Sequence, residues 1–132
     1  MATQTRRRAA RLTRTVRWRR DAQEHDFPAA ESYLRLLHPR KQVAKIILRL
    51  RETTITHFKA KDIFRASQLS LLGISNTHVE TDREKILAGV ALSPLLLVRD
   101  EINSRVVIAD GYHRLCAVYG FDEDALIPCR IV

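Results

Sequence analysis

The most constraining feature of this sequence is an apolar segment that ends in Asp110-Gly111 and leads at once into a second apolar segment. Residues 106–109 are Val-Val-Ile-Ala, a composition typical of a buried strand. Residues 112–119 have apolar side chains on nearly every side, which predicts a buried helix with its polar groups confined to the first turn. With the further elements described below, this segment indicates a domain that mixes helices and strands.

The chain has 132 residues, which is enough for one domain and too short for two with separate cores. Apolar residues make up 45% and charged residues 29%, which favours a globular protein over a disordered one. No apolar run approaches the roughly eighteen residues of a transmembrane helix, so no membrane partner is expected. Cys116 and Cys129 are too few for a disulfide framework or a structural zinc site, which favours a reducing, cytoplasmic setting.

The formal net charge of +8 is concentrated at the start of the chain, in a leader over residues 1–20 that we expect to be flexible. The leader has no acidic residue and contains eight arginines: Arg6, Arg7, Arg8, Arg11, Arg14, Arg17, Arg19 and Arg20. This leaves 15 of the 23 basic side chains to balance the 15 acidic ones. The leader could bind a nucleic acid, with Trp18 stacked on a base, or could be a solvated tail or an organelle-targeting peptide.

Apolar periodicity predicts two helices after the leader. Residues 26–37 are expected to form the first, with Asp26 as its cap candidate and Pro28 near its first turn. Apolar side chains at helical spacing over residues 43–50 predict the second. By default these helices cover the sheet of their own domain, but residues 28–52 could instead serve as an interaction surface for a partner protein.

Strands and short helices are expected over the rest of the chain. A helix is expected to begin at Thr81 or Asp82, and Gly120 is expected to close the helix at 112–119 as a left-handed C-cap. Pro128 is expected at the start or the edge of the last strand. The other expected elements are strands at 53–59, 95–98, 105–109 and 127–131, a short helix at 61–65 and a loop at 69–76.

The first turn of the 112–119 helix conflicts with the usual placement of charge. His113 and Arg114 lie at the positive end of the helix dipole, where acids are normally preferred. A bound phosphate would resolve the conflict, because helix-start N–H groups, Gly111 and the donor fork of Arg114 suit an anion. The alternative is that Asp110 caps the helix while Arg114 pairs with an acid among residues 122–124. His113 is a candidate general acid or base, a phosphate donor or a satisfied core histidine.

The order of elements over residues 82–132 resembles the ParB/sulfiredoxin superfamily. The matching features are a helix, the proline-led strand at 93–98, the strand and turn at 107–114, a second helix, Gly120 and the final strand at 127–132. The resemblance implies an α+β fold in which a compact mixed sheet is packed with helices. The family-like domain would cover residues 53–132, preceded by two N-terminal helices at 21–52 that have no counterpart in the family.

The family's Gly-x-x-Arg turn binds nucleotide phosphates, and it corresponds to Gly111 and Arg114, with His113 beside them. The resemblance therefore implies a nucleotide ligand such as CTP, ATP or ADP. Mg²⁺ is a candidate cofactor, and Asp110 would position the metal, a water or an acceptor hydroxyl. Phosphotransfer, NTP hydrolysis or a nuclease-like reaction would use Asp110 and His113 as the catalytic residues.

Two branches of the superfamily fit poorly. Sulfiredoxins have a nucleophilic cysteine where this chain has Tyr112, so sulfinic-acid repair is rejected. Partition proteins have an Arg-rich segment where residues 75–78 are Ser-Asn-Thr-His, and they continue into a helical DNA-binding portion, so a DNA clamp is not expected. The alternative to a phosphate-binding domain is a non-enzymatic nucleic-acid-binding or regulatory protein that acts through the leader.

Overall fold

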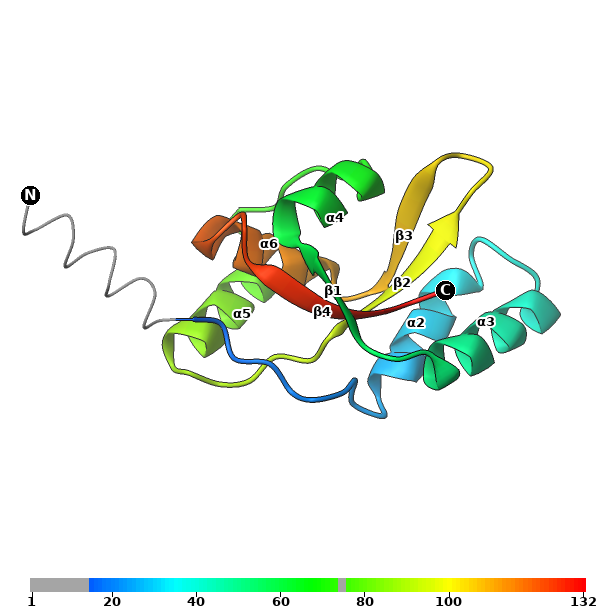
Figure 1. The fold of residues 1–132 in the computed structure, drawn as a ribbon, viewed down its shortest axis with the longest axis horizontal. Coiled ribbons are helices and arrows are strands. Elements are labelled where there is room, and N and C mark those ends of the chain that lie inside the picture. The colour runs from blue at the N-terminus through cyan, green and yellow to red at the C-terminus, as the bar shows by residue number, and fades with distance from the viewer. Residues whose placement is uncertain (1–14, 74–75) are drawn as a thin grey trace, which may run out of the picture.

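The computed structural model describes residues 15–73 and 76–132 and shows a mixed sheet with helices packed against it (Figure 1). The helices in this part of the chain are α2 (Asp26–Leu34), α3 (Arg40–Glu52), α4 (Ala60–Ser67), α5 (Thr77–Leu87) and α6 (Tyr112–Phe121). The strands are β1 (Thr56–Lys59), β2 (Leu95–Asp100), β3 (Arg105–Asp110) and β4 (Leu126–Ile131). The mixed α/β composition agrees with the expectation from the sequence.

The four strands form one sheet in the order β1-β4-β2-β3. Strands β2 and β3 form an antiparallel hairpin, and β1 is antiparallel to β4. Strand β4 runs parallel to β2, with Leu95 opposite Cys129. Parallel neighbours need a long connection, and helix α6 supplies it between β3 and β4.

Both faces of the sheet are buried because successive side chains of β2 point to opposite faces. Leu95 and Leu97 pack with residues of α4, α5 and α6, whereas Leu96 and Val98 pack with residues of α2 and α3. Figure 1 shows α2 and α3 together on one side, away from α5 and α6. The two N-terminal helices therefore cover their own sheet.

The described end of the leader is attached to the domain. The backbone N–H of Arg19 donates to the Leu92 carbonyl, and the Leu92 N–H donates to the Arg17 carbonyl, both at 2.8 Å. Trp18 is half-buried and packs against the core cluster that contains Leu95, so its indole is not free in solution. Arg20 is exposed. The other leader arginines, Arg6, Arg7, Arg8, Arg11 and Arg14, lie outside the described residues.

The side chain of one arginine connects three segments that are distant in the sequence. Arg130, on β4, pairs with both carboxylate oxygens of Asp21 at 2.7 Å. Its Nη1 also donates to the carbonyls of Leu50 and Arg51 at 3.2 Å and to that of Thr53. These carbonyls lie at the C-terminal end of α3, where backbone acceptors lack helical partners. Arg130 thus fixes the end of α3 and the N-terminal segment against the sheet.

Two helix starts differ from the sequence-based expectation. Helix α5 begins at Thr77 rather than at Thr81 or Asp82, because the Asn76 side chain accepts hydrogen bonds from two N–H groups of the first turn. Asp26 is the first helical residue of α2, and His25 is the N-cap. The Asp26 carboxylate instead accepts from the N–H of Gln23 at 2.8 Å.

The end of α6 and the position of Pro128 in β4 also differ from the sequence-based expectation. Gly120 does not close α6 in a left-handed conformation, because the helix continues to Phe121. Pro128 lies in an interior strand rather than at an edge, since β4 has β1 on one side and β2 on the other. The described pairing of β4 with β2 begins only at Cys129, so Pro128 precedes that ladder.

No helix in the described part of the chain has the length and apolar character needed to cross a bilayer.

We predict that Leu34→Ala lowers the free energy of unfolding of the whole domain by about 2–5 kcal/mol. Leu34 is fully buried between α2 and the sheet, so truncation leaves a cavity in the core. The matched control is Leu36→Ala, at a leucine that is 81% exposed and should change stability by less than about 0.5 kcal/mol. Urea unfolding followed by circular dichroism measures both, and equal stabilities would show that α2 lies outside the cooperative unit.

Candidate functional site

The turn between β3 and α6 is built on a glycine that no other residue could replace without strain. Gly111 has φ 109°, in the left-handed region that favours glycine. A Cβ at this position would lie 2.7 Å from Leu95 Cγ and 3.0 Å from Arg114 Nη2. The backbone at Gly111 is therefore packed directly between the core and the guanidinium of Arg114.

Arg114 is paired with Asp110, four residues earlier. Its Nη2 donates to Asp110 Oδ2 at 2.9 Å and to the Pro94 carbonyl at 3.2 Å, and both side chains of the ion pair are only 16% exposed. Burial raises the pKa of the Asp110 carboxyl, although the Arg114 charge opposes the shift. Arg114 Nε is buried and, within the described residues, has no hydrogen-bond acceptor.

This geometry excludes the alternative in which Asp110 caps the helix and Arg114 pairs with a later acid. Helix α6 has no side-chain cap, and the carboxylate of Asp110 is directed to Arg114. Asp124 pairs instead with Lys61, at 2.6 Å. Asp124 therefore links the end of α6 to α4, and the first turn of α6 contains no acidic residue of its own.

The starts of α5 and α6 lie side by side. His78 is the second residue of α5 and His113 the second residue of α6, and their ring centroids are 4.8 Å apart. The positive ends of two helix dipoles thus meet at a pair of imidazoles, next to Arg114. The sequence singled out His113 but placed His78 in a loop, because the start of α5 was predicted too late.

Asp82 belongs to this site and was missed as a functional candidate. It lies one turn after His78 on α5 and is buried. Burial raises the pKa of the Asp82 carboxyl, and the charges of Lys85 and Arg114 oppose the shift. Once α5 is known to begin at Thr77, the four-residue spacing places His78 and Asp82 on one helix face, which is the signal that would have found it.

The two cysteines offer no reactive thiolate. Both Cys116 and Cys129 are buried and free. Burial raises the pKa of Cys116, and it raises the pKa of Cys129 to about 12. Tyr112 donates its hydroxyl proton to the carbonyl of Ser70 and is a structural link to the loop before α5.

The described residues contain no group of three or more His, Cys, Asp or Glu side chains placed to hold a metal ion. Mg²⁺ commonly takes one or two carboxylates together with the oxygens of a bound phosphate. Asp110 and Asp82 are each near Arg114, and one carboxylate of this kind would suffice for a metal that arrives with a phosphate ligand.

In comparisons with known proteins, no family model matches this sequence, no curated protein matches it and no solved structure matches it. The function is therefore inferred from the geometry of the site.

We predict that Gly111→Ala lowers the free energy of unfolding by about 2–4 kcal/mol, because an L-residue is strained at this φ and its methyl group would overlap Leu95. Gly120→Ala, in the same helix, is the matched control: a Cβ there has no neighbour within 4 Å. Alanine in a helix should stabilise the control by up to about 1 kcal/mol. Chemical denaturation of both variants tests this, and equal effects would contradict the described turn.

We predict that Asp82→Asn raises the melting temperature by about 2–5 °C at neutral pH. Burial raises the pKa of Asp82 in the folded state, so protonation of this carboxyl favours folding. The stabilisation is complete below the pKa of the unfolded chain and is lost as the pH rises through the pKa of the folded state. The gain should therefore shrink toward about pH 4, where the unfolded carboxyl protonates. Thermal melts at both pH values check this, with the exposed Glu84→Gln on the same helix as control. A gain independent of pH would contradict the assignment.

Proposed function

We propose that this protein binds a nucleotide or another phosphate compound at the adjacent starts of α5 and α6, as a ParB/sulfiredoxin-like domain would. The observation that carries the proposal is the meeting of two helix N-termini at His78 and His113, with Arg114 behind them. The resemblance over residues 82–132 points independently to the same turn, through Gly111 and Arg114.

The N-terminal end of α6 is a favourable position for a bound anion. The N–H groups of the first helical turn have no intrahelical acceptors, and no side chain caps this end. Gly111 allows β3 to turn directly into α6, because its left-handed φ is favourable only for glycine. A phosphate at this position would accept from these N–H groups and would also be favoured by the dipole.

Arg114 supports a ligand in a second way. Its guanidinium is held by Asp110 and the Pro94 carbonyl, so it is oriented before any ligand arrives. The Arg114 side chain is only 16% exposed and its Nε is fully buried, so a ligand would contact the part of the guanidinium that remains exposed.

The two carboxylates give the site a possible chemical role beyond binding. Asp110 and Asp82 are buried beside cationic groups, and their pKa values are raised. Asp110 would position Mg²⁺ or take the proton of an acceptor hydroxyl, and His113 would act as the partner acid or base. The reaction class that fits is phosphotransfer or NTP hydrolysis.

The test is a thermal-shift and calorimetry series with pyrophosphate, CTP and ATP, each with and without Mg²⁺. A ligand of the folded state should raise the melting temperature. Arg114→Gln should weaken binding roughly ten- to hundredfold, because it removes a charge-assisted donor. His113→Gln, at a half-buried position, should also weaken it and is less disruptive to the core. Arg65→Gln, on the exposed face of α4, is the matched control.

Binding that survives both Arg114→Gln and His113→Gln would assign the phosphate contacts to the Arg-rich leader instead. The absence of a shift with every phosphate compound would overturn the proposal. Melting temperatures without ligand separate a loss of binding from a loss of fold, since the Arg114 variant also leaves Asp110 without its partner.

A further inference from the structure

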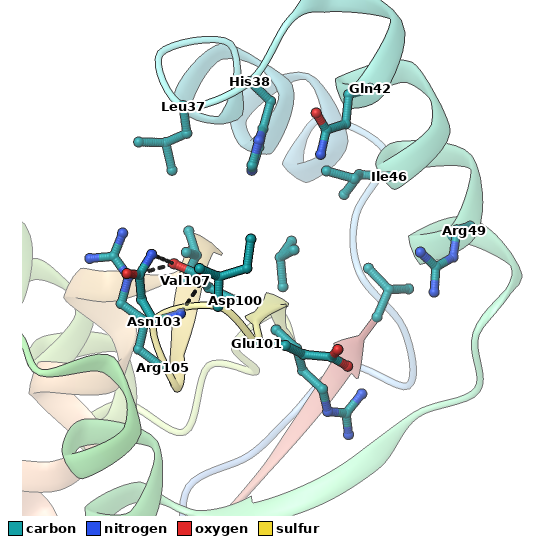
Figure 2. Close-up of a pocket in the computed structure, with 14 residues that line it drawn as sticks. Leu37, His38, Gln42, Ile46, Arg49, Asp100, Glu101, Asn103, Arg105 and Val107 are labelled. Carbon is teal, nitrogen blue, oxygen red and sulfur yellow. Dashed lines mark hydrogen bonds and ion pairs between the residues drawn. The ribbon is translucent and has the colours of Figure 1, made fainter.

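A separate cleft lies at the opposite end of β3. Its volume is about 570 Å³, and it separates α3 and the α2–α3 connection from the β2–β3 hairpin. Figure 2 shows Leu37, His38 and Gln42 on one wall and Asp100 and Glu101 on the facing wall. Strand β3 begins at this cleft and ends at the phosphate site, so roughly 17 Å of extended chain separates the two.

The cleft is apolar at its floor and along part of its rim. Ile46, Val98 and Val107 line it and are each more than nine-tenths buried. Leu37 is 41% exposed on one side, and Ile102, at the tip of the hairpin, is 95% exposed on the other. A nearly fully exposed isoleucine beside an apolar floor is typical of a protein-interaction surface.

The hairpin that presents Ile102 is held in one shape. The Asp100 carboxylate accepts from the backbone N–H of Asn103 at 3.3 Å, from its side-chain amide at 2.9 Å and from Arg105 Nε at 2.9 Å. The hydrogen bonds from Asn103, followed by that from Arg105, lower the pKa of Asp100, so the carboxylate is ionised at neutral pH. A preorganised hairpin reduces the entropy lost when a partner binds.

The charge of the cleft is positive. Arg49 on α3 and Arg99 on β2 line both the cleft and an adjoining hollow of about 320 Å³. In residues 15–73 and 76–132, neither arginine forms an ion pair, whereas Arg105 is neutralised by Asp100. Glu101 is the remaining acid of the cleft lining, and Glu52 also lines the adjoining hollow. The exposed face of α3 adds further cations at its start, at Arg40, Lys41 and Lys45.

We propose that this cleft binds an acidic, apolar peptide segment of a partner protein. Apolar side chains of the partner would cover Ile102 and Leu37, and carboxylates would pair with Arg49 and Arg99. The exposed apolar surface extends beyond the cleft to Leu36, which is 81% exposed, so it is larger than a small ligand would cover. A second copy of the chain would bring the cationic face of α3 against itself, which is unfavourable.

The proposal does not depend on the phosphate site. It is tested by fluorescence anisotropy on the full chain with a fluorescein-labelled, capped peptide of sequence ELEELLEE. Two control peptides separate the contributions: KLKKLLKK reverses the charge, and ESEESSEE removes the apolar side chains. The first peptide should bind, and both controls should bind at least about tenfold more weakly.

Variants locate the binding on the surface of the protein. The double variant Arg49→Gln with Arg99→Gln should weaken binding of ELEELLEE at least about tenfold, and Ile102→Ser should do the same. Their matched controls are Arg65→Gln, on exposed α4, and Leu126→Ser, at a leucine that is 57% exposed at the start of β4. All five positions are exposed, so melting temperatures should be unchanged.

Four outcomes would overturn the proposal. Equal binding of ELEELLEE and ESEESSEE would show a purely electrostatic contact, such as one with the leader. Unchanged affinity in the cleft variants would place the contact elsewhere on the surface. A failure of ELEELLEE to bind would exclude the acidic peptide. Concentration-dependent self-association that the Ile102→Ser variant abolishes would show that a second copy of the chain occupies the cleft instead. Arg114→Gln should leave peptide binding unchanged, which keeps this result separate from the phosphate proposal.

Discussion

Strand β2 hydrogen-bonds to β4 on one side and to β3 on the other, and its residues 95–98 are all buried. A strand in this position contributes to two cores, because alternate side chains enter opposite layers. Helices α2 and α3 are needed to cover one layer, and α4, α5 and α6 to cover the other. The N-terminal helices are therefore integral to the fold.

The same strand connects the core to the candidate site. Leu95 begins β2, and its side chain lies where a Cβ on Gly111 would have to go. Pro94, just before it, supplies a carbonyl to Arg114. The positions of the guanidinium and of the first turn of α6 are thus set by core packing rather than by flexible loops. A site of this kind is preorganised, because the groups around it cannot move without disturbing buried leucines.

The elements that the sequence predicted well are those with strong local signals. The apolar run of β2, the Asp-Gly turn before α6 and the helical spacing in α3 each identified an element correctly. The start of α5 was misplaced because an asparagine cap has no hydrophobic signal, and Gly120 was assigned a cap although the helix runs past it. The Asp110–Arg114 pair and the contact of His78 with His113 depend on tertiary packing, so local spacing alone did not show them.

The interior position of β4 has a consequence for how the domain folds. Of the described strands, β1 pairs only with β4, and β4 lies between β1 and β2 in the sheet. Until residues 126–131 are in place, β1 and the β2–β3 hairpin share no hydrogen bonds, and each exposes an open edge. Assembly of the sheet therefore waits for contacts between segments about seventy positions apart, and topologies of this kind fold more slowly than those with local pairings. Arg130 lies on this same strand, so placing the strand also fixes the end of α3 and Asp21, and β4 thereby joins both layers.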